Sequence, residues 1–148
     1  MKVYLASPFF NDRERAIYQK VIALLREEKD LDVFVPQEHI IPNGWDMPNH
    51  IWAENVFAVD ILGIQKADVV VVLNFGMYSD SGTAWECGYA YALNKKIVNV
   101  IVGEVDDDYS LMMLNGNHHT ISLRDLEMWQ LKAILKRNIN NIIEYEQK

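Results

Sequence analysis

Short apolar runs alternate along the chain with segments whose apolar residues recur at helical spacing. The most apolar run, residues 67–75, is rich in valine and bounded by turn residues, which is typical of a strand buried on both faces of a parallel sheet. Similar runs predict three more strands, at 3–6, 31–35 and 96–102. A weaker run at 119–121 predicts a short edge strand.

Helical segments lie between these strands and after the last one. Asn11 or Asp12 can cap a first helix, whose apolar residues follow one side. A second helix is predicted from about residue 50 to residue 66, and a third after Gly82. A terminal helix is predicted from Leu123 to about Tyr145.

The alternation of strands and helices predicts an α/β fold in one domain spanning residues 1–148. Strands that alternate with helices build a doubly wound parallel sheet, here of about five strands with helices on both faces. We expect the flavodoxin-like strand order. The phosphate-binding fingerprints of doubly wound folds are missing, because the chain has neither a G-x-G-x-x-G element nor a Walker loop.

Charge and composition narrow the class of partner. The chain has 14 basic and 21 acidic residues, a net charge of −7, and its basic residues are scattered rather than clustered. This balance argues against binding to nucleic acid. There is no signal-peptide pattern and no apolar span of 18 residues, so we expect a cytoplasmic protein that does not enter a membrane.

Cysteine and histidine usage argues against disulfides and metals. The single cysteine, Cys87, excludes an internal disulfide and is interpreted as a small buried hydrophobic residue. The histidines lack metal-ligand spacing with other ligands, so we predict no metal site. The histidines are His39, His50, His118 and His119.

Two irregular segments are candidates for binding. Residues 37–49 contain two prolines and an Asn-Gly pair, and this long loop after a strand is suited to a binding loop or lid. Residues 103–117 are polar except for Leu111–Leu114. That apolar insert is either a small core plug or a patch that contacts a neighbouring subunit.

Carboxylates gather where ligands bind in an open α/β sheet, beyond the carboxyl ends of the strands. Asp80 lies in the predicted loop and Glu86 in the first turn of the following helix. From spacing alone, Glu86 fits a capping box that begins at Thr83. The alternative is catalysis, since neighbouring carboxylates can serve as a nucleophile and an acid, and Gly82 allows close approach of a ligand or a positive φ.

Other residues have similar double interpretations. Asp60 lies among apolar helix neighbours, including Trp52 two turns earlier, so it either pairs at a helix boundary or has a raised pKa. The pair Phe9–Phe10 after the first strand suits the wall of a planar ring, or a hydrophobic staple before the helix.

Four stretches together resemble the nucleoside 2-deoxyribosyltransferase family. They are Tyr4-Leu-Ala-Ser-Pro-Phe-Phe10, Asp60 in its helix, Asp80-Ser-Gly-Thr-Ala-Trp-Glu86-Cys-Gly-Tyr-Ala90, and Ser110-Leu-Met112. They occur in the family's order over about residues 2–120. The resemblance implies a flavodoxin-like fold and exchange of the base of 2′-deoxynucleosides through a covalent deoxyribosyl–enzyme intermediate. Deoxynucleosides and free bases are then the partners, and no cofactor or metal is needed.

The resemblance also assigns roles to residues. Glu86 is implied as the nucleophile and Tyr4 as the residue that orients it. Asp80 and Asp60 hold the sugar hydroxyls and help to protonate the departing base. The implied walls of the base site are Phe9, Phe10 and Trp52, and Ser110 and Met112 lie at the sugar and the pocket entrance. Met112 comes from a neighbouring subunit, which implies a homo-oligomer, from dimer to hexamer, with shared sites.

Departures from the family pattern keep rival functions open. Ser110 stands where the family often has asparagine, and Ile40 where a base-reading glutamine is expected. One rival is a hydrolase of the same superfamily, a deoxynucleoside 5′-monophosphate N-glycosidase. It requires a phosphate cradle, but Ser7-Pro-Phe-Phe10 lacks glycine and arginine. The other is a non-catalytic nucleoside-binding module, in which Glu86 is dispensable.

Overall fold

A computed structural model describes residues 1–77, 80–103 and 108–137 of the chain. Five strands form one sheet: β1 (Lys2–Ala6), β2 (Asp32–Phe34), β3 (Val69–Asn74), β4 (Lys96–Ile101) and β5 (His119–Ser122). The α-helices are α1 (Asp12–Glu27), α2 (Asn49–Lys66), α3 (Ser81–Ala92), α4 (Leu111–Asn115), α5 (Leu123–Met128) and α6 (Leu131–Lys136). Two single 3-10 turns, η1 (Pro36–Glu38) and η2 (Gly44–Asp46), lie within the predicted binding loop.

The sheet has the order β2-β1-β3-β4-β5, and every neighbouring pair is parallel. The flavodoxin-like prediction is therefore confirmed. All six residues of β3 are buried, as its unbroken apolar run predicts for a central strand. The edge strand predicted near residue 119 is also present, as β5 beside β4.

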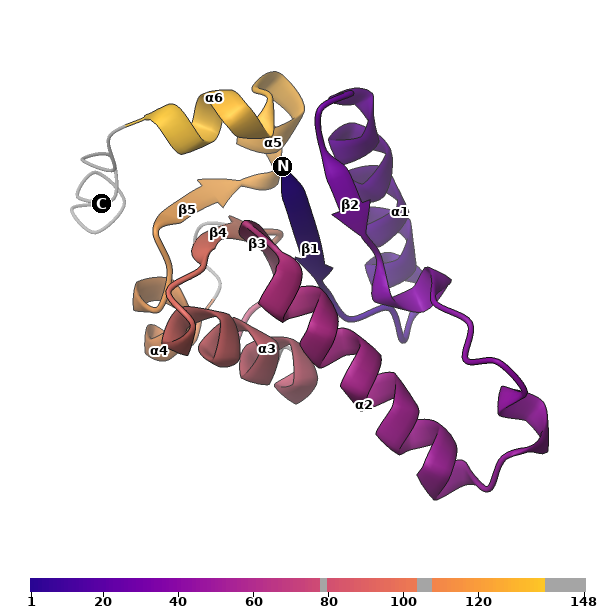
Figure 1. Ribbon diagram of the computed structural model, residues 1–148. Helices are drawn as coiled ribbons and strands as arrows, with labels where there is room; N and C mark the ends of the chain where they lie inside the picture. The colour runs from indigo at the N-terminus through magenta and orange to yellow at the C-terminus, as the bar shows by residue number, and fades with distance from the viewer. Residues whose placement is uncertain (78–79, 104–107, 138–148) are drawn as a thin grey trace.

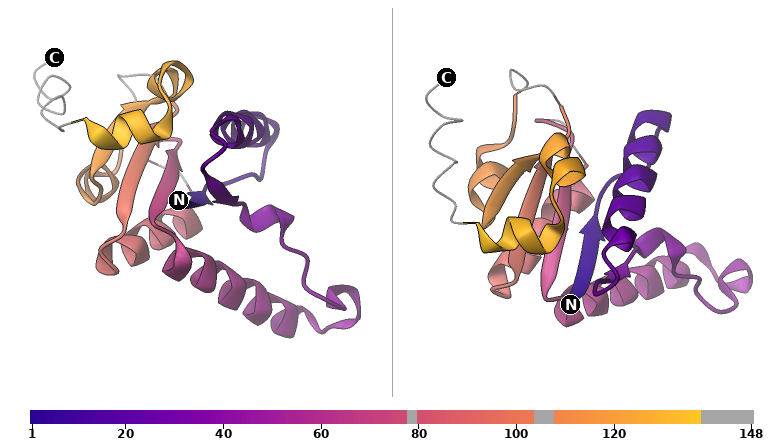
Figure 2. Two further views of the ribbon diagram at one scale, coloured as in Figure 1. Left: turned by 45° about the horizontal axis from the view of Figure 1, so that its top comes forward. Right: turned by 90° about the horizontal axis from the view of Figure 1, so that it is seen from above.

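Helices cover both faces of the sheet (Figure 1, Figure 2). One face packs against α1, α5 and α6 through a buried cluster that includes Leu25, Leu126 and Leu131. The other face packs against α2, α3 and α4 through a smaller cluster that includes Tyr4 and Ile64. We call these the α1 face and the α2 face.

Local caps explain where several helices begin. Asn11 is the N-cap of α1, because its side-chain oxygen accepts from the backbone N–H of Glu14 at 2.9 Å. The prediction of a cap at Asn11 or Asp12 is confirmed. Helix α5 begins with a capping box between Ser122 and Asp125.

The prediction of one long terminal helix from Leu123 is wrong within the described residues. The chain instead forms α5 and α6, separated by Trp129 and Gln130 in extended conformation. A second helix can begin here because the buried Glu28 carboxylate accepts from the N–H groups of Leu131 and Lys132, at 2.8 and 3.2 Å. The remainder of the predicted helix, 138–145, lies outside the described residues.

Helix α2 extends well beyond the sheet and leads away from it toward η2 (Figure 1). Its apolar residues are distributed around the helix, so several are exposed, including Trp52, Phe57 and Leu62. In the part of the chain that the structure describes, none of the helices combines the length and hydropathy that crossing a membrane requires.

Candidate active site

Strand β1 supplies the tyrosine of the site. Tyr4 points to the α2 face, is fully buried and stacks with Phe34 of the neighbouring strand at a centroid distance of 5.3 Å. The parallel register that pairs Tyr4 with Phe34 sets these rings side by side. The Tyr4 hydroxyl donates a hydrogen bond to Oε2 of Glu86.

Helix α3 supplies Glu86, and the helix start shows why this carboxylate is available. The N-cap is Asp80, whose Oδ2 accepts from the backbone N–H of Thr83 at 2.8 Å and from its hydroxyl at 3.0 Å. Glu86 therefore lies in the second turn rather than the first. The interpretation of Glu86 as part of a capping box is wrong. The N-cap is Asp80, three residues before Thr83, and Glu86 accepts a hydrogen bond from Tyr4 instead.

Gly82 does not have the positive φ that was one of its two predicted roles. It lies inside α3, and the only glycine with a positive φ in the described part of the chain is Gly76, at 116°. A Cβ atom at Gly82 would lie 3.0 Å from Oδ2 of Asp80. Its small size therefore leaves room for the cap rather than for an unusual backbone conformation.

The surroundings of Glu86 favour its neutral form. The pKa of Glu86 is raised to about 7, mainly by burial. The hydrogen bond from Tyr4 lowers this pKa, and the charges of Asp60 and Asp80 raise it. Burial and the Glu86 charge also raise the pKa of Tyr4, so its hydroxyl keeps its proton and remains a donor. The result is a carboxylate that changes charge near neutral pH, which is suited to nucleophilic or acid–base chemistry.

Asp60 joins this group from α2. Its charge acts on both Tyr4 and Glu86, so side chains from β1, α2 and α3 lie near one another. Partial burial raises the pKa of Asp60, and the charge of His39 lowers it. The predicted alternative of a raised pKa is therefore the one the structure supports. We call Glu86, Asp60 and Asp80 the carboxylate cluster.

The three predicted aromatic walls lie in different surroundings. Phe9 stacks with Tyr18 at 5.4 Å and packs against the core of the α1 face, and it also stacks with Phe10 at 5.4 Å. Phe10 is 69% exposed. Trp52 lies on the protruding half of α2, two turns from Asp60, and its ring adjoins Gly44 of the η2 turn. It is thus about 12 Å along the helix from the carboxylate cluster.

The Ser110–Met112 segment opens α4. Ser110 occupies the N-cap position but makes no capping hydrogen bond with its side chain. Leu111 and Met112 are 71% and 76% exposed, whereas Met113 is buried against the α2 face. The apolar insert is therefore partly a core plug, and its other side is an exposed apolar patch.

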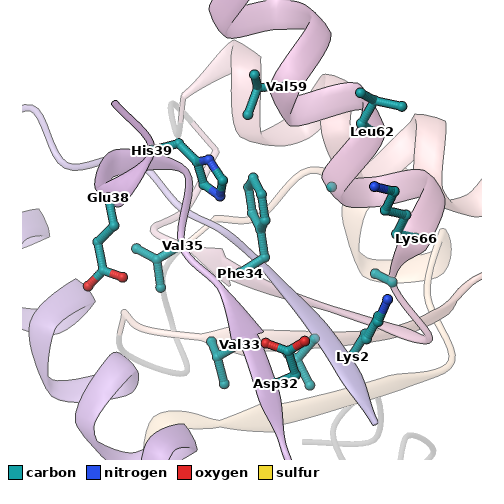
Figure 3. Close-up of a pocket in the computed structure, with 13 residues that line it drawn as sticks. Lys2, Asp32, Val33, Phe34, Val35, Glu38, His39, Val59, Leu62 and Lys66 are labelled. Carbon is teal, nitrogen blue, oxygen red and sulfur yellow. The ribbon is translucent and has the colours of Figure 1, made fainter. Parts of the chain in front are cut away.

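A cavity of about 570 Å³ lies between β2 and α2 (Figure 3), and Tyr4 and the carboxylate cluster are not among the residues that line it. Phe34 and His39 line it together with Val59 and Leu62 of α2. The His39 ring stacks with Phe34 at 4.3 Å. Sequence reasoning missed both Phe34 and His39, and only the loop position of His39 could have pointed to a site.

Two further sequence predictions concern cysteine and metals. Cys87 is buried, as predicted, and burial raises the pKa of its thiol to about 11. Over residues 1–77, 80–103 and 108–137, no group of three or more His, Cys, Asp or Glu side chains could hold a metal ion.

Comparison with known proteins identifies the family. The model of the nucleoside 2-deoxyribosyltransferase family matches residues 3–123. The chain belongs to this family. The resemblance to this family is thereby confirmed, and so is an enzyme family acting on nucleosides. No significant match was found among curated protein sequences.

Several solved structures resemble the chain over most of its length. A 2-deoxyribosyltransferase from Bacillus psychrosaccharolyticus has a TM-score of 0.75 and 29% identity, covering 90% of this chain and 96% of its own. A 2-deoxyribosyltransferase from Leishmania mexicana has a TM-score of 0.60 at 23% identity, covering 86% of this chain and 94% of its own. A CMP N-glycosidase from Clostridium botulinum, BcmB, has a TM-score of 0.58 at 21% identity, with coverages of 86% and 93%. The last two share the fold.

Proposed function

We propose that the protein transfers the 2-deoxyribosyl group between the bases of 2′-deoxynucleosides through an ester on Glu86. A carboxylate oxygen of Glu86 forms a bond to the anomeric carbon as the glycosidic C–N bond breaks, and the base leaves with the bonding electrons and gains a proton. A second base then attacks the same carbon and releases Glu86. The scheme parallels retaining glycoside cleavage, in which one carboxylate is the nucleophile.

One observation supports this proposal most strongly. Glu86 caps no helix and pairs with no cation in the described part of the chain, yet it is held by the hydroxyl of the buried Tyr4. A partly buried carboxylate that accepts a single oriented hydrogen bond, beside two more carboxylates, has no evident structural task. It is well suited to attack on an electron-poor carbon.

The neighbouring residues are proposed to bind the substrate. Asp60 and Asp80 hold the sugar hydroxyls and help to protonate the departing base. In support, the charges of both residues raise the pKa of Glu86, so both carboxylates lie in its neighbourhood. Phe9, Phe10 and Trp52 wall the base, and Ser110 approaches the 5′ end of the sugar. A dry pocket around the ester favours attack by a base over attack by water.

The first experiment separates transfer from hydrolysis. Deoxyinosine is incubated with adenine or cytosine, beside a sample without acceptor base, and the products are separated by chromatography. We expect a new deoxynucleoside only when the acceptor is present. Equal release of hypoxanthine in both samples would identify a nucleosidase, and turnover of a deoxynucleoside monophosphate alone would identify the N-glycosidase. If none of these substrates is turned over, the result would favour the alternative of a non-catalytic nucleoside-binding module.

We further propose that copies of the chain associate and share active sites. Phe57, Trp85 and Tyr89 form an aromatic row across α2 and α3, with centroid distances of 5.6 and 5.4 Å. Phe57 and Trp85 are more than half exposed, as are Leu111 and Met112. Such an apolar surface is typical of an interface, and from a neighbouring copy Met112 can close the pocket.

Light scattering at micromolar concentration tests this association. We expect an oligomer for the wild type and a monomer for Trp85→Lys. Lys29→Gln is the control, because Lys29 is exposed and lies outside the aromatic row. A wild-type monomer would contradict the shared site. Retention of the oligomer in Trp85→Lys would place the interface elsewhere.

A further inference from the structure

Two asparagines lie on inner strands of the sheet, among buried apolar residues. Asn74 ends β3 and Asn99 lies within β4, and both residues are fully buried. Side chains alternate along each strand, and Val72 and Ile97, two residues before them, belong to the buried cluster of the α2 face. Both asparagines therefore point to the α2 face. Burying an amide costs free energy unless its atoms are hydrogen-bonded, so two amides in a valine-rich core need an explanation.

Each of the two amides is only partly satisfied. Oδ1 of Asn74 accepts from the backbone N–H of Gly76 at 3.1 Å, and Nδ2 of Asn99 donates to the backbone carbonyl of Met113 at 3.2 Å. Within the residues that the structure describes, Nδ2 of Asn74 and Oδ1 of Asn99 have no hydrogen-bond partner. A leucine of similar shape would avoid this cost. The two amides are thus better explained by what their bonded atoms hold than by core stability.

The bond from Asn99 ties helix α4 to the sheet. Met113 supplies that carbonyl from the middle of α4 and packs its side chain into the buried cluster of the α2 face. Asn117 also donates to this carbonyl, at 2.8 Å, but it belongs to the segment that follows α4 directly. The thiol of Cys87 in α3 makes a second link, to the carbonyl of Gly116 at 3.7 Å. Helix α4, which lies beside α3 (Figure 1), is therefore tied to both β4 and α3.

The bond to Asn74 fixes the chain that leads into α4. Gly76 donates this bond at a turn of the chain, where its φ is 116°. The next residue, Met77, donates its backbone N–H to the carbonyl of Asp108 at 2.7 Å. Asp108 lies two residues before Ser110, which is the N-cap residue of α4. The two buried asparagines thus act on the segment that carries Ser110 from both of its ends.

We propose that Asn74 and Asn99 are positioning residues, which together fix α4 so that Ser110 meets the 5′ end of the sugar. A helix of five residues is too short to be stable alone, so its place depends on such anchors. Ser110 does not cap α4 with its hydroxyl, which suits a group that contacts a substrate. The contact of Ser110 with the sugar rests on the proposed function, whereas the anchoring of α4 does not.

The first arm of the test compares two substrates that differ only at the 5′ position, deoxyinosine and 2′,5′-dideoxyinosine. The ratio of their kcat/KM values in transfer to adenine reports the contact with the 5′-hydroxyl. Asn74→Leu and Asn99→Leu remove the two anchors, and Asn99→Ala replaces the latter if leucine prevents folding. Asn115→Leu is the matched control, because Asn115 is exposed and its amide donates within α4, to the carbonyl of Leu111 at 2.8 Å. Thermal melting verifies that each variant is folded.

We expect this ratio to fall about tenfold in Asn74→Leu and Asn99→Leu, because a displaced Ser110 loses one hydrogen bond to the 5′-hydroxyl. Ser110→Ala should lower it by a similar factor, and adding Asn99→Leu to Ser110→Ala should lower it no further. Asn115→Leu should keep the wild-type ratio. Equal losses on both substrates in Asn99→Leu would indicate a purely structural role and overturn the proposal.

The second arm follows α4 itself by amide hydrogen exchange, measured by NMR in the full-length protein. The backbone N–H groups of Leu114 and Gly116 donate to the carbonyls of Ser110 and Met112, at 3.0 and 2.8 Å, and report local opening of the helix. We expect their exchange to be about tenfold faster in Asn99→Leu, and unchanged in Asn115→Leu. Exchange in Asn99→Leu equal to that of the wild type would overturn the anchoring of α4.

The two arms fail separately. If the wild type turns over no nucleoside or nucleotide, the proposed function is wrong, and hydrogen exchange still decides whether Asn99 anchors α4. If the wild type is active and hydrogen exchange does not respond to Asn99→Leu, only the present proposal is wrong. If Ser110→Ala keeps the wild-type ratio, Ser110 does not contact the 5′-hydroxyl, and the positioning role of the two asparagines is wrong with it.

Discussion

Two glutamates with limited exposure differ sharply in their surroundings. Glu28, on the α1 face, accepts hydrogen bonds from two backbone N–H groups at the start of α6. Glu86, on the α2 face, accepts one hydrogen bond from a phenol and lies beside two other carboxylates. The Glu28 carboxylate stabilises the fold, because it accepts hydrogen bonds from two backbone N–H groups that no longer bind water once they are buried. The surroundings of Glu86 disfavour its charged form, so this residue does not stabilise the fold by its charge. A role in chemistry explains better why a carboxylate lies there.

Replacing the carboxyl group of Glu86 tests this difference most strongly. Glu86→Gln keeps an oxygen that accepts from Tyr4 but removes the nucleophile, so deoxyribosyl transfer should fall by at least about a thousandfold. Turnover is measured by chromatography with deoxyinosine and adenine. Transfer within tenfold of the wild-type rate would rule out Glu86 as the covalent centre.

The same variant should be more stable than wild type at alkaline pH. The folded-state pKa of Glu86 is raised from 4.5 to about 7, so the protonated form contributes stability that is fully present below pH 4.5. That contribution is lost as the pH rises through 7. Glu86→Gln should therefore exceed wild type by on the order of 3 kcal/mol at pH 8, with no difference at pH 4. Urea denaturation at the two pH values measures this, and equal stability at both would contradict the raised pKa.

Glu28 should give the opposite result. Glu28→Ala leaves the N–H groups of Leu131 and Lys132 without their acceptor, and should lower the free energy of unfolding by about 2 kcal/mol. Transfer per folded molecule should stay near the wild-type value, because α6 lies on the face opposite the carboxylate cluster. Urea denaturation and the transfer assay are run on the same sample. A selective loss of transfer would mean that the two faces are coupled.

The last prediction concerns the pH dependence of the wild-type rate. Nucleophilic attack requires ionised Glu86, so kcat/KM should decrease as the pH falls below about 7, by about tenfold per unit. Because Asp60 and Glu86 interact, the observed pKa belongs to the pair rather than to one residue. Asp60→Asn removes a negative charge that raises the pKa of Glu86, and should move this limb to lower pH. If this part of the pH profile does not move in Asp60→Asn, the charge of Asp60 does not affect the pKa of Glu86.

Features set by neighbouring residues in the chain were predictable from the sequence. The apolar run of β3, the Asn11 cap of α1 and the alternation of strands and helices all have local causes, and together they predict a parallel sheet with helices on both faces. The break between α5 and α6 has a distant cause, since Glu28 lies 103 residues before Leu131. A helical pattern across residues 123–137 cannot reveal it.

The sequence indicates which side chains belong to the candidate site but not which partners they contact. Both Asp80 and Thr83 are good N-cap residues, so spacing alone allows α3 to begin at either, and only the first choice releases Glu86 from capping. The contact of His39 with Phe34 depends on how the chain turns through η1. Neither residue type nor spacing distinguishes that histidine from the other three.

The packing of the Phe34 ring depends on the absence of a side chain at Gly63. The edge of the Phe34 ring occupies the space that a methyl group at this position would need, and the same ring stacks with both Tyr4 and His39. A Gly63→Ala substitution would therefore push the ring into its neighbours, and the displacement would reach Glu86 through the Tyr4 hydroxyl. A residue with no side chain, chemically inert and remote in sequence from Glu86, thus limits which substitutions this enzyme tolerates.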